Sequence, residues 1–382
     1  MRRMILHIHG FDPRGPAFYH VLYRDEAAKQ EQVTGSRLHI GPRQNTGPQS
    51  SSWTIESRDS DHPVSAVFEI QRWDDLVRAN WPRSGWHVAR TVLRYTASFL
   101  RSGMIRHVFR LQPRRILTVL FPIGALLSAV LLVSIAMCLI LAAFQAATGW
   151  PNLIYWLALP LTLAATPAAV ALLDRKTHLF WLARILAFTC DDAAGRLPEL
   201  EQRKDLFADR LIEHVRSRRF DEVLVSGHSV GATLAVSAVG RALDKEPNLP
   251  GLGTALSLMT LGQSMPLVGK HPHAAAFRRE LAACAEADGL TWIDISAGAD
   301  PACFYRIDPV LACNGARDNQ APAGPKLVSA RFHDLFSEET YRKLRKRKNL
   351  MHFCYLTATE KRGDYDFFAI TAGAAPLETR FS

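Results

Sequence analysis

The sequence contains few cysteines and no pattern that would pair them. Six cysteines are scattered over 382 residues, and none forms a C-x-x-C motif. A small disulfide-bonded scaffold or a zinc ribbon needs regular spacing, so we expect neither, and a reducing compartment fits best. The sequence also lacks a glycine-rich phosphate loop, a dinucleotide-binding fingerprint and an EF-hand calcium loop, so we expect no cofactor and no metal ion.

Acidic residues are scarce in one stretch, residues 72–115. This stretch holds ten arginines but only two acids, Asp74 and Asp75, and so supplies +8 of the net charge of +10. The remainder of the chain is close to balanced. A net charge of +10 could indicate a nucleic-acid partner, but the basic charge is confined to one stretch. It therefore needs a local explanation, and we expect no nucleic-acid partner.

Charge is absent altogether from residues 116–173. These 58 residues contain no Asp, Glu, Lys, Arg or His. A hydrocarbon core of about 30 Å needs only about 20 helical residues, so the stretch is long enough for two spans. We expect a transmembrane helical hairpin with arms at 117–147 and 153–173, joined by a turn at 149–152 that has aromatic residues around it. A buried core hairpin of a soluble protein is the alternative, but such helices seldom lack every charge.

Arginines and lysines flank both ends of the predicted hairpin, whereas its turn carries no charge. By the positive-inside rule, both ends and the folded remainder of the chain lie on the cytoplasmic side of the membrane. Before the hairpin, arginines alternate with apolar residues over 86–111, which is typical of an amphipathic helix. We expect this basic helix to lie on anionic headgroups of the bilayer.

The chain therefore divides into four segments. The first part of a folded domain occupies 1–85, a basic juxtamembrane helix occupies 86–115, the hairpin occupies 116–173, and the second part of the domain occupies 174–382. We expect a buried strand to start at Met4, and therefore expect no secretory signal peptide before it.

Strand and helix patterns alternate on both sides of the apolar stretch. We expect strands at 4–8, 37–40, 53–58, 64–71, 223–225, 254–261, 290–296 and 352–357, and helices at 17–32, 197–219, 232–243, 274–287 and 338–348. This alternation predicts an α/β fold with a mainly parallel, doubly wound sheet that is interrupted by the hairpin.

One motif organises the second half of the chain. The β-branched run 223–225 leads into Gly227-His-Ser229-Val-Gly231, and a small-residue helical pattern follows at once. A serine at the apex of such a strand–turn–helix bend stands in a strained backbone conformation with its hydroxyl exposed. The two glycines let the strand and the helix approach each other closely.

This segment resembles the nucleophile elbow of the α/β-hydrolase superfamily, in the style of a lipase or esterase. The resemblance implies a serine nucleophile at Ser229, followed along the chain by an acid and then by a histidine. Asp300 fits the acid because it follows a predicted strand and a small-residue turn, while its rival Asp294 lies in the middle of that strand. For the base, His352 and His333 both remain candidates.

We prefer His352 because a histidine three residues before a tyrosine is similar to the base region of several lipase-like hydrolases. The resemblance also implies an oxyanion hole built from two backbone N–H groups. Val230 N–H follows the nucleophile, and Phe11 N–H belongs to a His9-Gly10-Phe11 segment that resembles the His-Gly loop of the superfamily.

The sequence thus predicts a membrane-anchored serine hydrolase that cleaves an ester, thioester or amide through an acyl-enzyme. Its expected partners are the lipid bilayer and an acyl-containing substrate, and a membrane anchor is compatible with an amphiphilic one. An acyltransferase would use the same residues. The alternative from another class is a non-enzymatic, hydrolase-like membrane scaffold in which Ser229 is idle. A small transporter is excluded because two spans without an internal charge cannot enclose a pathway.

Overall fold

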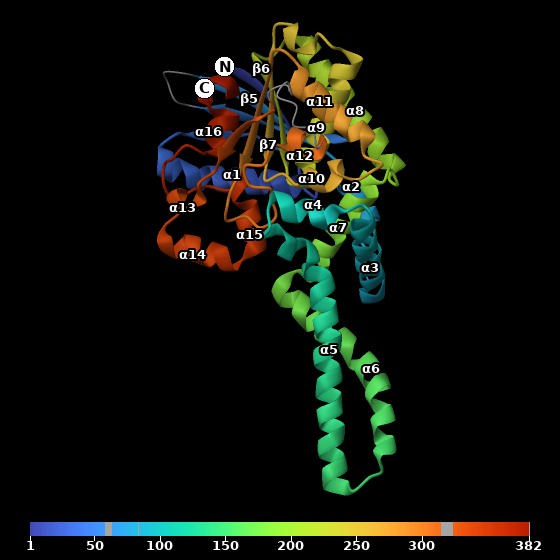
Figure 1. The fold of residues 1–382 in the computed structure, drawn as a ribbon. Helices are drawn as coiled ribbons and strands as arrows, with labels where there is room; N and C mark the ends of the chain where they lie inside the picture. The colour runs from blue at the N-terminus through green and yellow to red at the C-terminus, as the bar shows by residue number, and fades with distance from the viewer. Residues whose placement is uncertain (58–62, 83, 315–323, 382) are drawn as a thin grey trace. The chain divides into compact units, whose positions relative to one another are not determined.

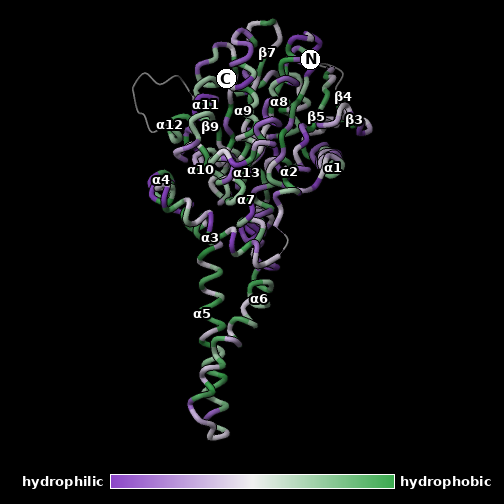
Figure 2. The backbone as a smooth tube through the Cα atoms, turned by 90° about the vertical axis from the view of Figure 1, so that its right-hand side faces the viewer, coloured by the Kyte–Doolittle hydropathy of each residue, from purple (hydrophilic) through white to green (hydrophobic). Residues whose placement is uncertain are grey.

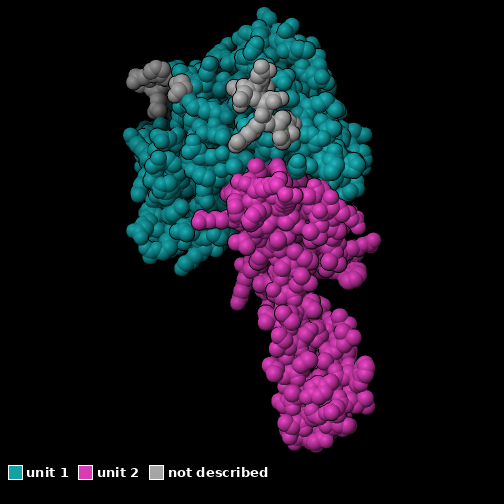
Figure 3. Space-filling view, viewed as in Figure 1, with its two compact units in different colours: residues 1–80, 191–382 teal, residues 81–190 magenta. Residues whose placement is uncertain are grey.

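A computed structural model describes residues 1–57, 63–82, 84–314 and 324–381. The chain forms two compact units, shown in different colours in Figure 3. Unit 1 comprises residues 1–80 and 191–382, and unit 2 comprises residues 81–190.

Within its described residues, unit 1 contains a nine-stranded sheet in the order β2-β4-β5-β1-β6-β7-β8-β9, with β3 paired to β4. Strands β5, β1, β6, β7, β8 and β9 are parallel to one another, and only β2, β3 and β4 pair antiparallel. The mainly parallel sheet is therefore confirmed. The strands are β1 (Arg2–Ile8), β2 (Leu38–Ile40), β3 (Gln44–Gly47), β4 (Ser50–Ser57), β5 (Val64–Gln71), β6 (Glu222–His228), β7 (Ala255–Leu261), β8 (Leu290–Ser296) and β9 (Lys326–Ser329).

Helices cover both faces of this sheet (Figure 1). One face carries α8 (Pro198–Ser217), α9 (Val230–Lys245) and α11 (Ala275–Glu286), and the other carries α1 (Pro16–Thr34) and α16 (Phe367–Ala372). The described part of unit 1 also contains shorter helices: α2 (Asp74–Ala79), η2 (Leu249–Gly251), α10 (Pro266–Gly269), α12 (Pro309–Asn314), α13 (Phe332–Leu335), α14 (Glu338–Lys346), α15 (Lys348–Phe353), η3 (Cys354–Leu356) and α17 (Leu377–Arg380).

The core of unit 1 beneath α1 and α16 is aromatic. Trp53 of β4 stacks on Phe68 of β5 with ring centroids 4.7 Å apart, and Tyr23 of α1 packs against both rings. A buried ion pair crosses from β1 to β6: Arg3 Nε donates to Glu222 Oε2 at 2.6 Å, and neither side chain is exposed. Such a charge pair is tolerated because the Arg3 guanidinium also donates to three backbone carbonyls near the C-terminus.

All regular secondary structure in the described part of unit 2 is helical. It contains α3 (Gly85–Arg101), α4 (Met104–Leu111), α5 (Arg115–Thr148), η1 (Asn152–Leu157), α6 (Ala158–Thr177) and most of α7 (Leu179–Ala193). The single basic helix predicted over 86–111 is in fact two helices, because Gly103 adopts a left-handed conformation with φ 69° and ends the run.

The helix α5 and the segment formed by η1 and α6 are long and apolar enough to cross a membrane. They pack along each other, and Figure 2 shows their predominantly hydrophobic composition. At about 1.5 Å per residue, the residues of α6 that precede Asp174 extend about 24 Å, and η1 adds a further apolar turn to this segment. The turn follows Thr148 as predicted, and Gly149 caps α5 in a left-handed conformation.

One predicted strand is wrong. Residues 352–357 form the end of α15 and the 3-10 turn η3 instead of a strand. Phe353 and Tyr355 favour β-structure in isolation, but β9 takes the position beside β8 in the sheet. Tertiary contacts of the buried Tyr355 decide the local conformation.

Candidate active site

Ser229 lies at the bend between β6 and α9, where strand, turn and helix follow one another as predicted. Its backbone has φ 59° and ψ −124°, a conformation that L-residues rarely adopt. A conformation of this kind costs on the order of 1–3 kcal/mol and persists only where surrounding structure enforces it. The side chain is half-buried, so the hydroxyl is accessible at the apex of the bend.

Two glycines enforce the bend. A Cβ built on Gly227 would lie 2.5 Å from the carbonyl oxygen of Gly231, and a Cβ on Gly231 would overlap the carbonyl oxygen of Ile8. No other residue fits either position, because real Cβ atoms do not approach that closely. The close approach also brings the end of β1 beside the first turn of α9.

The loop after β1 passes directly beside the serine. A Cβ on Gly10 would lie 3.2 Å from Ser229 Cβ and 3.4 Å from the carbonyl oxygen of His228. Ser229 and this loop therefore share one edge of the sheet. The edge lies at the carboxyl ends of β1 and β6, where the strand order reverses, and this is the position at which open α/β sheets bind ligands.

His352 and Asp300 form a buried pair. His352 Nδ1 lies 2.7 Å from Asp300 Oδ2, and the side chains are 5% and 0% exposed. A carboxylate oxygen accepts this hydrogen bond, so Nδ1 carries the proton and Nε2 presents a lone pair. Nε2 is buried and makes no hydrogen bond, including none to Ser229 Oγ.

The carboxylate of Asp300 is itself held in place. Its Oδ2 accepts a second hydrogen bond from the Tyr355 hydroxyl at 3.1 Å, and its Oδ1 accepts one from the Ala302 N–H at 2.8 Å. The Tyr355 oxygen in turn accepts from the Ala297 N–H at 2.9 Å. Tyr355 thus joins the helical segment that carries His352 to the loop that carries Asp300.

The His352 ring lies at the same edge of the sheet as Ser229. The Ser229 N–H donates to the carbonyl of Leu261, the last residue of β7, at 2.8 Å. The next residue, Gly262, has φ 57°, and a Cβ built on it would lie 3.3 Å from His352 Cε1. The end of β7 is therefore in contact with both the serine backbone and the imidazole ring.

The two rival residues lie in different surroundings. His333 is 58% exposed on α13, with the neighbouring Asp334 carboxylate 3.4 Å away. Asp294 lies within β8, as predicted, and accepts a hydrogen bond from the Thr260 hydroxyl at 2.6 Å. Burial raises the pKa of Asp294 to about 7. The structure therefore pairs His352 with Asp300 and buries Asp294 in the sheet.

Of the two predicted oxyanion donors, Val230 stands at the bend and Phe11 follows Gly10 in the neighbouring loop. Val230 is the first residue of α9, so its N–H lacks an acceptor within the helix and lies at the positive end of the helix dipole. Phe11 belongs to the loop that passes Ser229. The carbonyl of Gly10 accepts a hydrogen bond from His9 Nδ1 at 2.8 Å. Because N–H and C=O of a trans peptide point in opposite directions, this bond fixes the direction of the Phe11 N–H.

His9 belongs to the segment that resembles the His-Gly loop. Its ring lies between Tyr19 and Trp73, with centroids 4.9 Å and 5.5 Å away and nearly parallel planes. Trp73 Nε1 donates to the His9 carbonyl at 3.0 Å. These contacts hold the loop beside Ser229. Among the described residues no cluster of three or more His, Cys, Asp or Glu could hold a metal ion.

His228 is a residue whose role sequence reasoning missed. Its Nε2 donates to the carbonyl of His352 at 2.9 Å, and the two rings lie 4.8 Å apart. Burial and the adjacent His352 lower the pKa of His228 to about 3, so the ring stays neutral and donates only from Nε2. His228 thus fixes the backbone of the candidate base.

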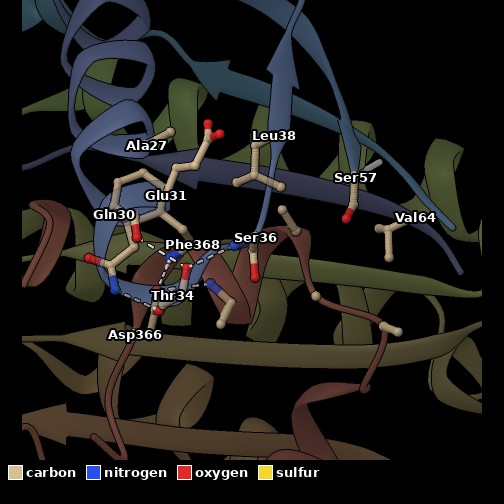
Figure 4. A pocket seen from close by; sticks show the side chains of 14 residues that line it. Ala27, Gln30, Glu31, Thr34, Ser36, Leu38, Ser57, Val64, Asp366 and Phe368 are labelled. Carbon is tan, nitrogen blue, oxygen red and sulfur yellow. Dashed lines mark hydrogen bonds between the residues drawn. The ribbon is translucent and has the colours of Figure 1, made fainter. Parts of the chain in front are cut away.

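The cavity in Figure 4 lies elsewhere in unit 1. It has a volume of about 570 Å³ and is bordered by residues of α1, β2 and α16, among them Gln30 and Asp366. The side chains of these two residues bond to each other at 2.8 Å. No residue of the Ser229 site lines this cavity.

Comparisons with known proteins give no relative for this chain: no family model, no curated protein and no solved structure matches it.

Proposed function

We propose that the protein is a serine hydrolase of the α/β-hydrolase type that cleaves an ester, thioester or amide through an acyl-enzyme at Ser229. One observation carries the proposal. A buried His352–Asp300 pair presents an unpartnered Nε2 at the same sheet edge as a serine held in a strained bend. A serine hydroxyl needs such a base to become a nucleophile, and the carboxylate orients the imidazole.

The proposed reaction has two halves. His352 Nε2 takes the Ser229 proton while Oγ bonds to the carbonyl carbon of the substrate, whose oxygen becomes an oxyanion facing the N–H groups of Val230 and Phe11. The bond to the leaving group then breaks, and His352 returns the proton to that group. A water molecule attacks the acyl-enzyme, gives its proton to His352, and releases the acid as Oγ regains a proton.

The absence of a hydrogen bond between Nε2 and Ser229 Oγ does not oppose this role. Catalytic hydrogen bonds are often long in proteins without substrate and tighten in the complex. The conformation of Ser229, the close approach of Gly10 to Ser229 and the close approach of Gly262 to the imidazole all support the assignment of one site. The buried acid–base pair favours His352 over the exposed His333 as the base.

The second part of the proposal is a membrane anchor. We infer that α5 and the η1–α6 segment form a transmembrane hairpin. The covalent connection to this hairpin anchors the hydrolase unit to the membrane, with that unit in the cytoplasm. Large side chains such as Leu127, Leu139 and Leu159 are more than 60% exposed along these helices, as expected for a lipid-facing surface.

A fluorophosphonate probe tests the chemistry. We expect the full-length protein to be labelled and Ser229→Ala and His352→Gln to lose the label, while the control His333→Gln keeps it. A folded protein that stays unlabelled would favour the scaffold instead, and retained labelling in Ser229→Ala would place the nucleophile elsewhere.

Accessibility of introduced cysteines tests the anchor. In a Cys138→Ser background the other five cysteines are buried. A cysteine at position 152, in the hairpin turn, should react with an impermeant reagent added to intact cells, and one at position 345, on α14, should not. The reverse pattern would invert the orientation, and equal reaction at both positions would argue against a span.

A further inference from the structure

Helix α3 is apolar on two opposite faces. One face is buried, and its residues Val88, Val92, Tyr95 and Phe99 are at most 1% exposed. On the other face Trp86, Leu93 and Leu100 are 76%, 61% and 63% exposed. Their spacing of seven residues places them in one stripe along the helix. The buried face already supplies the packing of α3, so this stripe needs another explanation.

Arginines run beside the stripe. Arg90 and Arg101 are exposed next to Leu93 and Leu100 at helical spacing, and α4 continues the pattern with Arg106, Phe109 and Arg110. The described residues include no ion pair or hydrogen-bond partner for these four arginines. The sequence between Asp75 and Asp174 contains no acidic residue that could neutralise them.

We propose that this surface is a binding site for anionic phospholipid headgroups. It comprises Trp86, Arg90, Leu93, Leu100 and Arg101 of α3, together with Arg106, Phe109 and Arg110 of α4, and we call it the arginine face. The inference rests on the membrane anchor proposed above and adds a requirement for lipid charge, which an apolar hairpin by itself does not have.

Two features favour a bilayer surface as the occupant. The arginines attract phosphate, whereas Leu93 and Leu100 gain only from an apolar boundary, which a lipid interface offers and a nucleic-acid backbone lacks. The surface is also continuous in the chain with an apolar helix, because α4 is followed within four residues by α5. Basic residues next to a span are attracted to anionic lipid.

A fluorescent probe on the stripe tests this proposal in the full-length chain. Leu93→Cys in the Cys138→Ser background is labelled with an environment-sensitive dye, and the protein is reconstituted into nanodiscs. The discs contain phosphatidylcholine alone or phosphatidylcholine with phosphatidylglycerol at about three to one. We expect a blue-shifted emission in the anionic discs only, and its loss in high salt, which screens surface charge.

Removing two arginines should weaken this response. Each basic residue near an anionic surface contributes about fivefold to binding, so Arg90→Gln with Arg101→Gln should lower the ratio of bound to free probe about 30-fold. The matched control is Arg345→Gln with Lys346→Gln on α14, which removes the same charge from unit 1 and should leave the shift unchanged.

Three outcomes would overturn the proposed role of the arginine face. They are equal emission in the two lipid compositions, an equal loss of the blue shift in the control pair, and the same blue shift when poly(U) RNA replaces the lipid. Failure of the anchor has a different signature, because the protein would then not float with vesicles of phosphatidylcholine alone. If the hairpin does not insert, the labelled protein is mixed with preformed vesicles of the two compositions. A blue shift with the anionic vesicles only supports the arginine face, and equal emission with both overturns it. Fluorophosphonate labelling of the same samples reports the hydrolase chemistry separately.

Discussion

Replacing Asp300 by Asn should remove the base function of His352 while leaving the fold in place. The wild-type carboxylate accepts from His352 Nδ1 at 2.7 Å and from the Ala302 N–H at 2.8 Å, through different oxygens. An asparagine that keeps its oxygen on the Ala302 N–H must turn its NH₂ group toward His352. The NH₂ then donates to Nδ1, so the ring proton moves to Nε2 and Nε2 no longer has a free lone pair to accept the serine proton.

The opposite orientation of the asparagine would keep the wild-type tautomer of His352, but it has an energetic cost of its own. With its oxygen on His352, its NH₂ would face the Ala302 N–H, and two donors would oppose each other in a buried position. An unsatisfied buried donor costs about 1–3 kcal/mol. In the first orientation the Tyr355 hydroxyl loses its acceptor on residue 300, but Cys303 Sγ lies 3.6 Å away as another acceptor, so the first orientation prevails. The wrong tautomer in a serine–histidine–carboxylate site lowers kcat about 10⁴-fold, which corresponds to about 5.4 kcal/mol of transition-state stabilisation.

The assay is the rate of fluorophosphonate labelling, followed by hydrolysis of short acyl esters if they are turned over. Asp334→Asn, which alters the carboxylate beside the exposed His333, is the matched control and should change the rate less than twofold by this reasoning. Thermal unfolding in detergent checks that both variants remain folded. A folded Asp300→Asn protein that reacts within tenfold of the wild type would refute the acid–base assignment.

Three further predictions follow from other contacts of unit 1. His9→Phe keeps a flat ring between its aromatic neighbours but removes the donor to the Gly10 carbonyl, so labelling should slow about 10- to 100-fold with little change in Tm. Glu222→Gln leaves a buried guanidinium without a counter-charge and should cost about 3–5 kcal/mol of stability, whereas Asp221→Asn breaks an exposed pair and should cost less than about 1 kcal/mol; equal Tm losses would contradict this. The pKa of Asp294 is raised from 3.8 to about 7, so the folded state binds more protons than the unfolded chain over this range and stability falls as pH rises through it. Asp294→Asn should therefore raise Tm at about pH 8 and have no effect at about pH 4, as thermal melts at both pH values would show.

Local features of the site could be predicted from the sequence because they depend on neighbours in the chain. The bend at Ser229 needs only a β-branched run, two glycines and a helical pattern within about fifteen residues. The parallel sheet follows from the alternation of strands and helices, and the hairpin turn at Gly149 follows from the uncharged stretch around it. In each case the local sequence is sufficient to determine the local structure.

Features that depend on distant contacts could not be settled in this way. The choice between His352 and His333 rests on which ring meets Asp300, and the bond from Tyr355 to Asp300 joins residues 55 positions apart. The same contacts place His352 in a helix where β-propensity favours a strand. The donation of His228 to the His352 carbonyl spans 124 positions and has no signal in the local sequence.

Two features at one sheet edge reduce the stability of the fold and help to separate an enzyme from a scaffold. The backbone of Ser229 is strained by on the order of 1–3 kcal/mol, which a glycine at that position would relieve. The lone pair of His352 Nε2 is buried without a partner, and an apolar ring would avoid the cost of desolvating it. A binding scaffold gains nothing from either feature. A site that transfers a proton from a serine needs both, because the bend exposes the hydroxyl and the free lone pair is the atom that accepts its proton. Their occurrence together, with Asp300 fixing the imidazole, is therefore the physical reason to favour acyl chemistry.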